Sequence, residues 1–211
     1  HGIVGPDKLP AANKPVKLIR MYTPGWEISN ADVKSSFETA LERLESAGVE
    51  IVEPSSLPSL QLLEDYFSRV EWCIAEIAAF EMRWPFFEYE AAGYTHHPRI
   101  SNLLSRAHEV TLSDYHKALE FKSRLKEHFL GLSNEFDGIV GLTAPEVAPV
   151  GLENLGHPVN CSPATCMGAP SLTLPLLVAN DMPLGLQLID FHNEDASLFS
   201  KAAWVNNFLQ K

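Results

Sequence analysis

The sequence predicts an α/β fold in which helices cover a mixed, largely parallel sheet. Two observations carry this prediction. A strand, an amphipathic helix and a second strand follow one another within residues 16–52, which is the pattern of a βαβ unit with parallel strands. Apolar strand-like runs then return at 137–142 and between 172 and 189, after long helical segments. Strands alternating with helices in this way are typical of a sheet that helices cover.

The prediction of the βαβ unit depends on the spacing of its apolar residues. V-K-L-I-R at 16–20 and V-E-I-V at 49–52 predict the two strands. Between them, over residues 31–47, apolar side chains recur at the spacing of one helical face. They are Val33, Phe37, Ala40, Leu41, Leu44 and Ala47. Asn30 is a suitable N-cap, and Gly48 is suited to end the helix.

The rest of the sequence predicts three further helices and a single domain preceded by a linker or surface loop. Helices are expected over 60–82, 112–130 and 193–209, and the first should end near Trp84-Pro85 because proline interrupts helices. The aromatic segment that follows this proline is expected to be irregular or broken-helical. Residues 1–15 are rich in proline and polar residues, which indicates a linker or surface loop before a single domain at 16–211. Because the chain begins at His1, we expect a processed product or a fragment of a longer protein.

Composition excludes several classes of function. The formal net charge is −11, and the sixteen basic residues form no stripe, which argues against nucleic acid as a partner. No run of eighteen apolar residues exists, so we expect no membrane span. Three cysteines are an odd and sparse set, which favours a reducing compartment such as the cytoplasm. The histidines lack H-x-x-x-H spacing, so we expect no metal site.

The loop at 143–170 is the candidate binding region. In α/β sheets, ligands bind at the loops that follow the carboxyl ends of strands, and this loop follows the strand at 137–142. Short side chains able to hydrogen-bond a polar ligand lie along it, at Asn160, Ser162 and Thr165. Its prolines restrict the unfolded backbone and so stiffen the loop. The alternative is a stiff surface connection that binds nothing.

Several motifs together resemble the carboxyl-terminal half of amidase-signature hydrolases. The two most specific are A-T-C-M-G-A-P-S-L-T-L-P at 164–175 and M-P-L-G-L-Q-L-I at 182–189. F-D-G-I-V-G-L-T-A-P at 136–145 is also similar to a family segment, and weaker matches lie at 44–53 and 111–119. The chain departs from the family pattern where Gly141 replaces a common threonine and Ala164 a common tryptophan. Both changes reshape a pocket without abolishing it.

The resemblance implies an α/β sandwich of which residues 16–211 are the carboxyl-terminal part. The family cleaves carboxamides through an acyl-serine, using a lysine, a serine in a cis peptide and a nucleophilic serine, with no metal or cofactor. The serines lie in a Gly/Ser-rich signature. This chain has no Gly-Gly pair and no such stretch, so we assign it no catalytic residue and expect it alone to be inactive.

The resemblance also implies which residues contact the amide substrate. Thr143, Asn160 and Thr165 would be hydrogen-bond partners, and Gly168 and Pro170 would form a turn that approaches the substrate closely. The expected protein partner is the amino-terminal half of the amidase, and the chain is a candidate for homo-oligomer formation through the apolar surface that this half covers. Two alternatives remain open: a catalytically inactive protein that binds a small molecule, and a partner subunit of a split amidase.

Overall fold

The structure is a computed structural model that describes residues 10–94, 97–191 and 193–211. Residues 1–9 of the predicted linker lie outside the described residues, and residues 10–15 form neither helix nor strand. The described part contains a five-stranded sheet in the order β2-β1-β3-β5-β4. Its strands are β1 (Lys17–Arg20), β2 (Glu50–Val52), β3 (Ile139–Leu142), β4 (Ser171–Ala179) and β5 (Met182–Ile189).

The predicted mixed sheet is confirmed, and its parallel part is confined to one half. β1 pairs in parallel with β2 and with β3, so the predicted βαβ unit is present. β5 runs antiparallel to both β3 and β4. This second half is antiparallel because β4 and β5 form a hairpin closed by Asn180 and Asp181, whose φ angles are 50° and 60°. Two positive φ angles in a row suit the right-handed twist of a tight hairpin.

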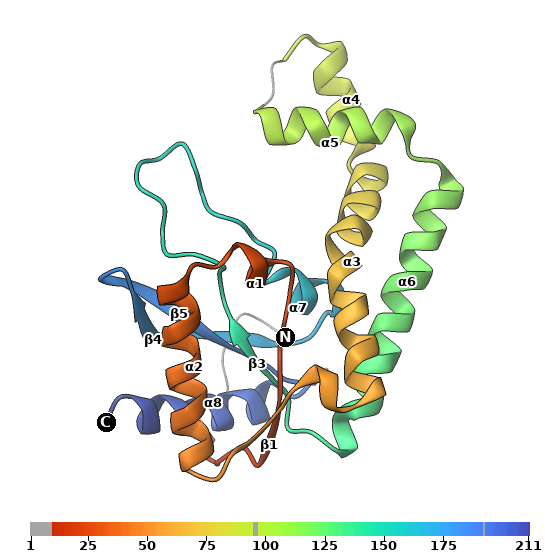
Figure 1. Cartoon of the computed structure of the whole chain (residues 1–211). Helices are drawn as coiled ribbons and strands as arrows, with labels where there is room; N and C mark the ends of the chain where they lie inside the picture. The colour runs from red at the N-terminus through yellow and green to blue at the C-terminus, as the bar shows by residue number, and fades with distance from the viewer. Residues whose placement is uncertain (1–9, 95–96, 192) are drawn as a thin grey trace.

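Eight α-helices accompany the sheet in the described residues (Figure 1). They are α1 (Gly25–Ile28), α2 (Ala31–Ser46), α3 (Pro58–Glu81), α4 (Arg83–Ala91), α5 (Pro98–Glu109), α6 (Leu112–Gly131), α7 (Ser162–Met167) and α8 (Asp195–Leu209). Four of these, α2, α3, α6 and α8, match the predicted helices to within two residues. As predicted, the Asn30 side chain caps α2 by accepting from the Val33 N–H at 2.9 Å.

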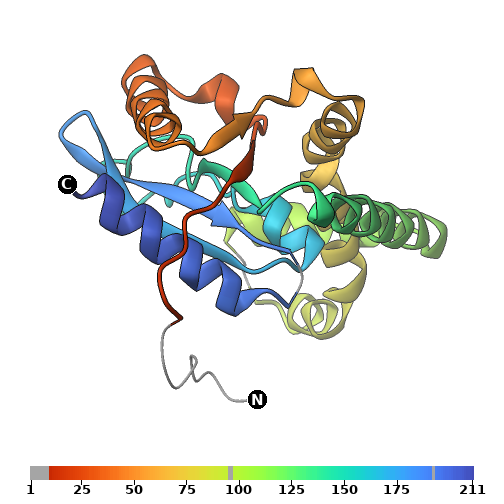
Figure 2. The ribbon, with the colours of Figure 1, turned by 90° about the horizontal axis from the view of Figure 1, so that it is seen from below.

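Two hydrophobic cores lie on opposite faces of the sheet, because successive side chains of a strand point to opposite faces. On β1, Leu18 joins a core shared with α2 and α8, while Ile19 joins a core shared with α3, α6 and α7. α2 and α8 lie to one side of the molecule and the α3–α6 pair to the other, and Figure 2 keeps this separation. α4 and α5 lie at the far end of the α3–α6 pair (Figure 1).

Four helices of the structure match no predicted helix: α1, α4, α5 and α7. The segment after Pro85, expected to be irregular or broken-helical, is broken-helical in its described residues, because α4 ends at Ala91 and α5 begins only at Pro98. The Glu76 carboxylate on α3 holds α5 in place through two hydrogen bonds from Arg106, of 2.8 and 2.7 Å. The last of the four, α7, interrupts the loop predicted at 143–170. With six residues, α7 is too short to show a helical period in the sequence.

Candidate functional site

The short helix α7 organises the candidate site. Pro163 lies in its first turn, where the missing N–H of proline costs nothing. Gly168 ends it at φ 64° and ψ 34°, the left-handed conformation that favours glycine. α7 lies beside α3, and the long loop from β3 leads into its amino-terminal end (Figure 1). The predicted site residues therefore lie on α7, on the loop that precedes it or just after its end.

Asn160, just before α7, is buried within the chain. Its side chain is 3% exposed, and its Oδ1 accepts a hydrogen bond from Thr23 Oγ1 at 2.5 Å. Thr23 Oγ1 in turn accepts from the Gly25 N–H at 3.1 Å. A side chain at Gly25 would bring its Cβ to 2.1 Å from Asn160 Oδ1, so only glycine allows this approach. Asn160 thus fastens the start of α7 to the residues that follow β1.

Thr143, at the end of β3, lies beside a cavity of about 260 Å³. Its N–H donates to the Gly185 carbonyl at 3.0 Å, and its hydroxyl donates to Thr173 Oγ1 at 3.2 Å. Its own carbonyl accepts from Cys161 Sγ at 3.2 Å. The cavity is lined by the loop that follows β3 and by His157 and Gly185. Thr143 therefore presents a half-buried hydroxyl where the sheet, the loop and α7 meet.

The remaining predicted residues lie on α7 and beyond it. The exposed Thr165 donates its hydroxyl to the Cys161 carbonyl at 3.2 Å. No heavy atom lies within 4 Å of the position that a Cβ would take at Gly168. Within this chain, its positive φ and not close packing therefore explains why a glycine stands at this position. The Pro170 carbonyl accepts from the Asp190 N–H at 3.0 Å. Thr143 and Thr165 thus both bond to Cys161, whereas Gly168 and Pro170 lie at the opposite end of the helix.

Sequence reasoning missed three residues of this region: Thr23, Thr173 and Gln187. Gln187 carried a signal, because it interrupts the apolar run of β5. It is 2% exposed, lies opposite Gly141 and Thr173 in the sheet, and its Oε1 has no hydrogen-bond partner among the described residues. A buried acceptor without a partner costs free energy.

We therefore expect Gln187→Met to leave the free energy of unfolding unchanged or to raise it by about 1 kcal/mol, because the change conserves volume and removes the unpaired carbonyl. Urea denaturation of the two chains measures the difference. A loss of more than about 1 kcal/mol would mean that Gln187 Oε1 has a partner in solution.

The threonine hydroxyls and the Cys161 thiol of the site are neutral polar groups, and none of them is an activated nucleophile. The hydroxyls of Thr143 and Thr173 bond to one another, and that of Thr165 bonds to a backbone carbonyl. Burial raises the pKa of the Cys161 thiol, which disfavours the reactive thiolate. A nucleophile needs a neighbouring base or a lowered pKa, and these groups have neither in their hydrogen bonds. The arrangement can bind and orient a small polar molecule.

Two other classes of site are not seen in the part of the chain that the structure describes. Within residues 10–94, 97–191 and 193–211, no group of three or more His, Cys, Asp or Glu side chains is placed to hold a metal ion. In the same ranges, none of the helices combines the length and the apolar character needed to cross a bilayer.

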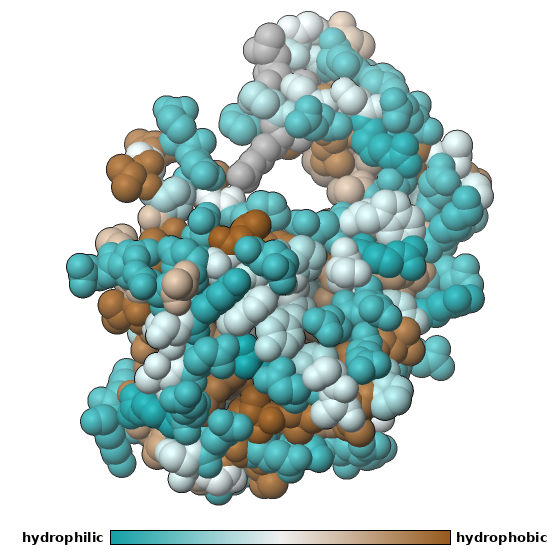
Figure 3. All heavy atoms as spheres, in the orientation of Figure 1, coloured by the Kyte–Doolittle hydropathy of each residue, from teal (hydrophilic) through white to brown (hydrophobic). Residues whose placement is uncertain are grey.

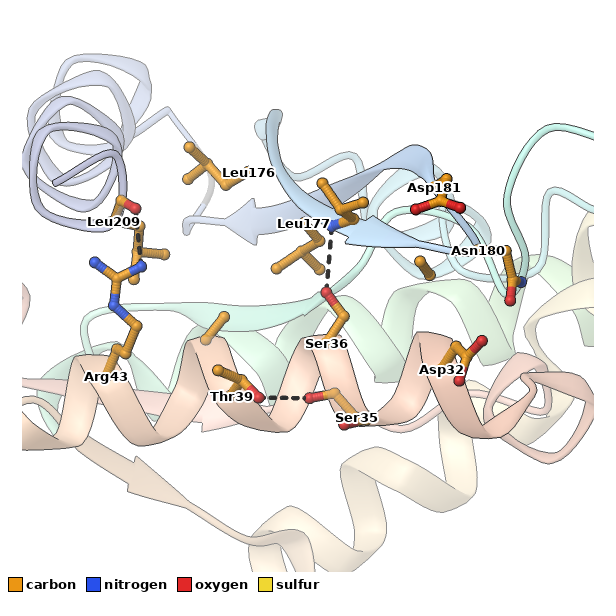
Figure 4. Close-up of a pocket in the computed structure, with 13 residues that line it drawn as sticks. Asp32, Ser35, Ser36, Thr39, Arg43, Leu176, Leu177, Asn180, Asp181 and Leu209 are labelled. Atoms are coloured by element: carbon orange, nitrogen blue, oxygen red, sulfur yellow. Dashed lines mark hydrogen bonds between the residues drawn. The ribbon is translucent and has the colours of Figure 1, made fainter.

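A larger cavity of about 450 Å³ lies elsewhere, between α2, the β4–β5 hairpin and the end of α8 (Figure 4). None of the predicted site residues lines it. Arg43 points toward Leu209 at one end, and Asp32 and Asp181 lie at the other. The Arg43 guanidinium already donates to the Leu209 and Phe208 carbonyls at 2.9 and 3.3 Å. Arg43 therefore anchors the end of α8. We interpret the cavity as the space left where these three elements meet.

Comparison with known proteins identifies the family. The family model described as Amidase matches residues 6–199. This chain belongs to the amidase family. The A subunit of glutamyl-tRNA(Gln) amidotransferase from Staphylococcus carnosus (strain TM300) is 23% identical over 210 residues, which cover 82% of this chain and 41% of that protein. The amidase resemblance drawn from the sequence motifs is thereby confirmed.

Solved structures show the same amidase fold. A crystal structure of an amidase matches with a TM-score of 0.73 at 18% identity, over 94% of this chain and 47% of that one. Fatty acid amide hydrolase matches with a TM-score of 0.72 at 14% identity, over 98% of this chain and 42% of that one. The chain spans less than half the length of each of these relatives.

Proposed function

We propose that this chain is the carboxyl-terminal part of an amidase that hydrolyses a carboxamide bond through a Ser-cisSer-Lys site lying outside residues 1–211. The observation that carries the proposal is the family match over residues 6–199 in a chain that spans 41% to 47% of its relatives. The site chemistry supports it, because the hydroxyls of this region lack a base. The residues of this chain would then supply a wall of the substrate pocket and not the reactive groups.

In the complete enzyme a serine would attack the amide carbon and release the amine, and water would then release the acid from the acyl-serine. Dividing the reaction at a covalent intermediate lowers the barrier of each half. Thr143 and Thr165 would hydrogen-bond the substrate. Asn160 would act mainly as a positioning residue, because its Oδ1 is engaged by Thr23. Gly168 and Pro170 would fix the end of α7.

The remaining part of the amidase would also cover apolar surface that this chain exposes. The loop between β3 and α7 carries three such side chains at its tip: Val150, Leu152 and Leu155, which are 103%, 92% and 83% exposed. Figure 3 shows apolar side chains on this projecting loop. Burying each would contribute about 1.5–3 kcal/mol. Alternatively, a second copy of this chain covers the same surface in a homo-oligomer.

Two other functions use the same site without catalysis by this chain. A catalytically inactive protein would bind a small amide or acid beside Thr143. A partner subunit would complete an amidase half encoded elsewhere. The length of the natural transcript separates both from one continuous amidase. In each case the three free cysteines fit a reducing compartment, and we propose the cytoplasm.

The Thr165 hydroxyl provides a direct test. In the full-length amidase, we expect Thr165→Val to lower kcat/KM for the best amide substrate about 2- to 10-fold, the value of one neutral hydrogen bond. Thr39→Val is the matched control, because Thr39 is also exposed on a helix and donates to the carbonyl four residues earlier, that of Ser35, at 2.9 Å. The control should leave kcat/KM unchanged. Equal kcat/KM values for both variants and the parent, over a panel of amides, would rule out substrate binding by Thr165.

A further inference from the structure

Two cysteines from distant parts of the chain meet in the core beside the candidate site. Cys73 lies on α3 and Cys166 on α7, 93 residues apart in sequence, and their Sγ atoms are 3.8 Å apart. Both side chains are buried. A disulfide requires two sulfurs at about 2.05 Å, so a shift of about 2 Å between α3 and α7 would join them. The third cysteine, Cys161, is partly exposed and bonds to Thr143 instead.

The surroundings distinguish the roles of the two sulfurs. The Cys73 thiol lies 3.3 Å from the Ala118 carbonyl of α6 and 3.8 Å from Cys166 Sγ, so it can donate its single proton to either. The hydrogen bond with Cys73 lowers the pKa of Cys166 against the opposing effect of burial, and the positive charge of Lys122 adds to the lowering. The same hydrogen bond, together with burial, raises the pKa of Cys73. Cys166 therefore has more thiolate character, and the thiolate is the form that attacks an oxidant.

We propose that Cys73 and Cys166 form a reversible disulfide when the protein meets hydrogen peroxide, and that this bond regulates the amidase site by displacing α7. The Cys166 sulfur attacks one peroxide oxygen, so that an S–O bond forms, the O–O bond breaks and the first water leaves. The Cys73 sulfur then attacks the resulting sulfenic acid, losing its proton; an S–S bond forms, the S–O bond breaks and the second water leaves. Two thiols are oxidised by two electrons, and hydrogen peroxide is reduced to two waters.

The proposed regulation follows from what α7 holds. Drawing Cys166 toward α3 moves a six-residue helix whose amino-terminal end is tied to Thr143 through Cys161 and to Thr23 through Asn160. These hydrogen bonds position the pocket wall described under the proposed function. The regulatory half of the inference therefore rests on that proposed function. A displacement of about 1 Å in a catalytic site can cost on the order of a hundredfold in rate.

The crosslink is tested on this chain alone, without any assay of activity. After exposure to hydrogen peroxide, denaturation and alkylation, we expect only one of the three cysteines to remain reactive, and peptide mapping to find Cys73 joined to Cys166. Dithiothreitol should restore all three. Cys161→Ala should form the same crosslink, whereas Cys73→Ala and Cys166→Ala should form none. Three reactive thiols after peroxide, a disulfide involving Cys161, or a sulfinic acid at Cys166 in the parent chain would each overturn the inference.

Regulation is tested on the full-length amidase. Peroxide should lower kcat/KM by on the order of tenfold to a hundredfold, and dithiothreitol should reverse the loss in the parent and in Cys161→Ala. Cys73→Ala should keep its activity under the same treatment. A crosslink that leaves kcat/KM unchanged would overturn the regulatory half. If the full-length protein hydrolyses no amide while the crosslink forms, the proposed function is what fails.

Discussion

Lys201→Met should lower the free energy of unfolding by about 3–5 kcal/mol, the cost of leaving one partner of a buried ion pair unpaired. Lys201 Nζ donates to Asp190 Oδ2 at 2.9 Å and to the Asp137 carbonyl. Asp190 is 1% exposed and directly follows β5, and its other carboxylate oxygen accepts from the Phe191 N–H at 2.8 Å. Without the lysine, a negative charge would remain buried between β5 and α8. The midpoint of urea denaturation measures the loss.

Two companion variants test the reason for this loss. Lys117→Met removes a lysine from an exposed ion pair with Asp114 at 3.4 Å, and such pairs contribute less than about 1 kcal/mol. Adding Asp190→Leu to Lys201→Met removes the unpaired charge and should recover most of the stability, since replacing a whole buried pair by apolar groups is often neutral. A double variant as unstable as Lys201→Met would show that packing of the lysine stem, and not the charge, matters.

Gly138→Ala is expected to lower the free energy of unfolding by a similar amount. Gly138 precedes β3 at φ 135°, and a Cβ there would lie 2.5 Å from the carbonyl oxygen of Ile189. Backbone strain of about 1–3 kcal/mol and overpacking of about 1–3 kcal/mol add to roughly 2–6 kcal/mol. The neighbouring atom belongs to the backbone of β5 and cannot rotate away. Relief would require separating β3 from its partner strand at Ile189.

The same substitution at Gly131 is the matched control. Gly131 ends α6 with helical angles of φ −61° and ψ −20°, and nothing lies within 4 Å of the position of a Cβ. Gly131→Ala should therefore raise the free energy of unfolding by about 0.5–1 kcal/mol, because alanine loses less backbone entropy than glycine. If Gly138→Ala cost no more than Gly131→Ala in urea denaturation, the close contact between β3 and β5 would be absent in solution.

Elements with a clear period could be predicted from the sequence, and irregular ones could not. The face of α2 that begins at Val33 is buried as its spacing predicted. α7 was missed because six residues are fewer than two helical turns, too few to show a period. Of the predicted site residues, Thr143 and Thr165 keep hydroxyls at or near the surface. Asn160 is predicted to be a hydrogen-bond partner of a ligand, and this stays a prediction; its Oδ1 accepts from Thr23, a contact that the sequence did not indicate.

By itself, the sequence determined the family, the βαβ unit and the absence of a Gly/Ser-rich signature, because these depend on residue identity and local spacing. The tertiary structure alone decided which distant groups meet. Thr23 and Asn160 are 137 residues apart, and Cys73 and Cys166 are 93 apart. Such contacts depend on how the sheet pairs and how the two cores pack around it. Periodicity reports which face of an element is buried, and it carries no information on the partner that buries it.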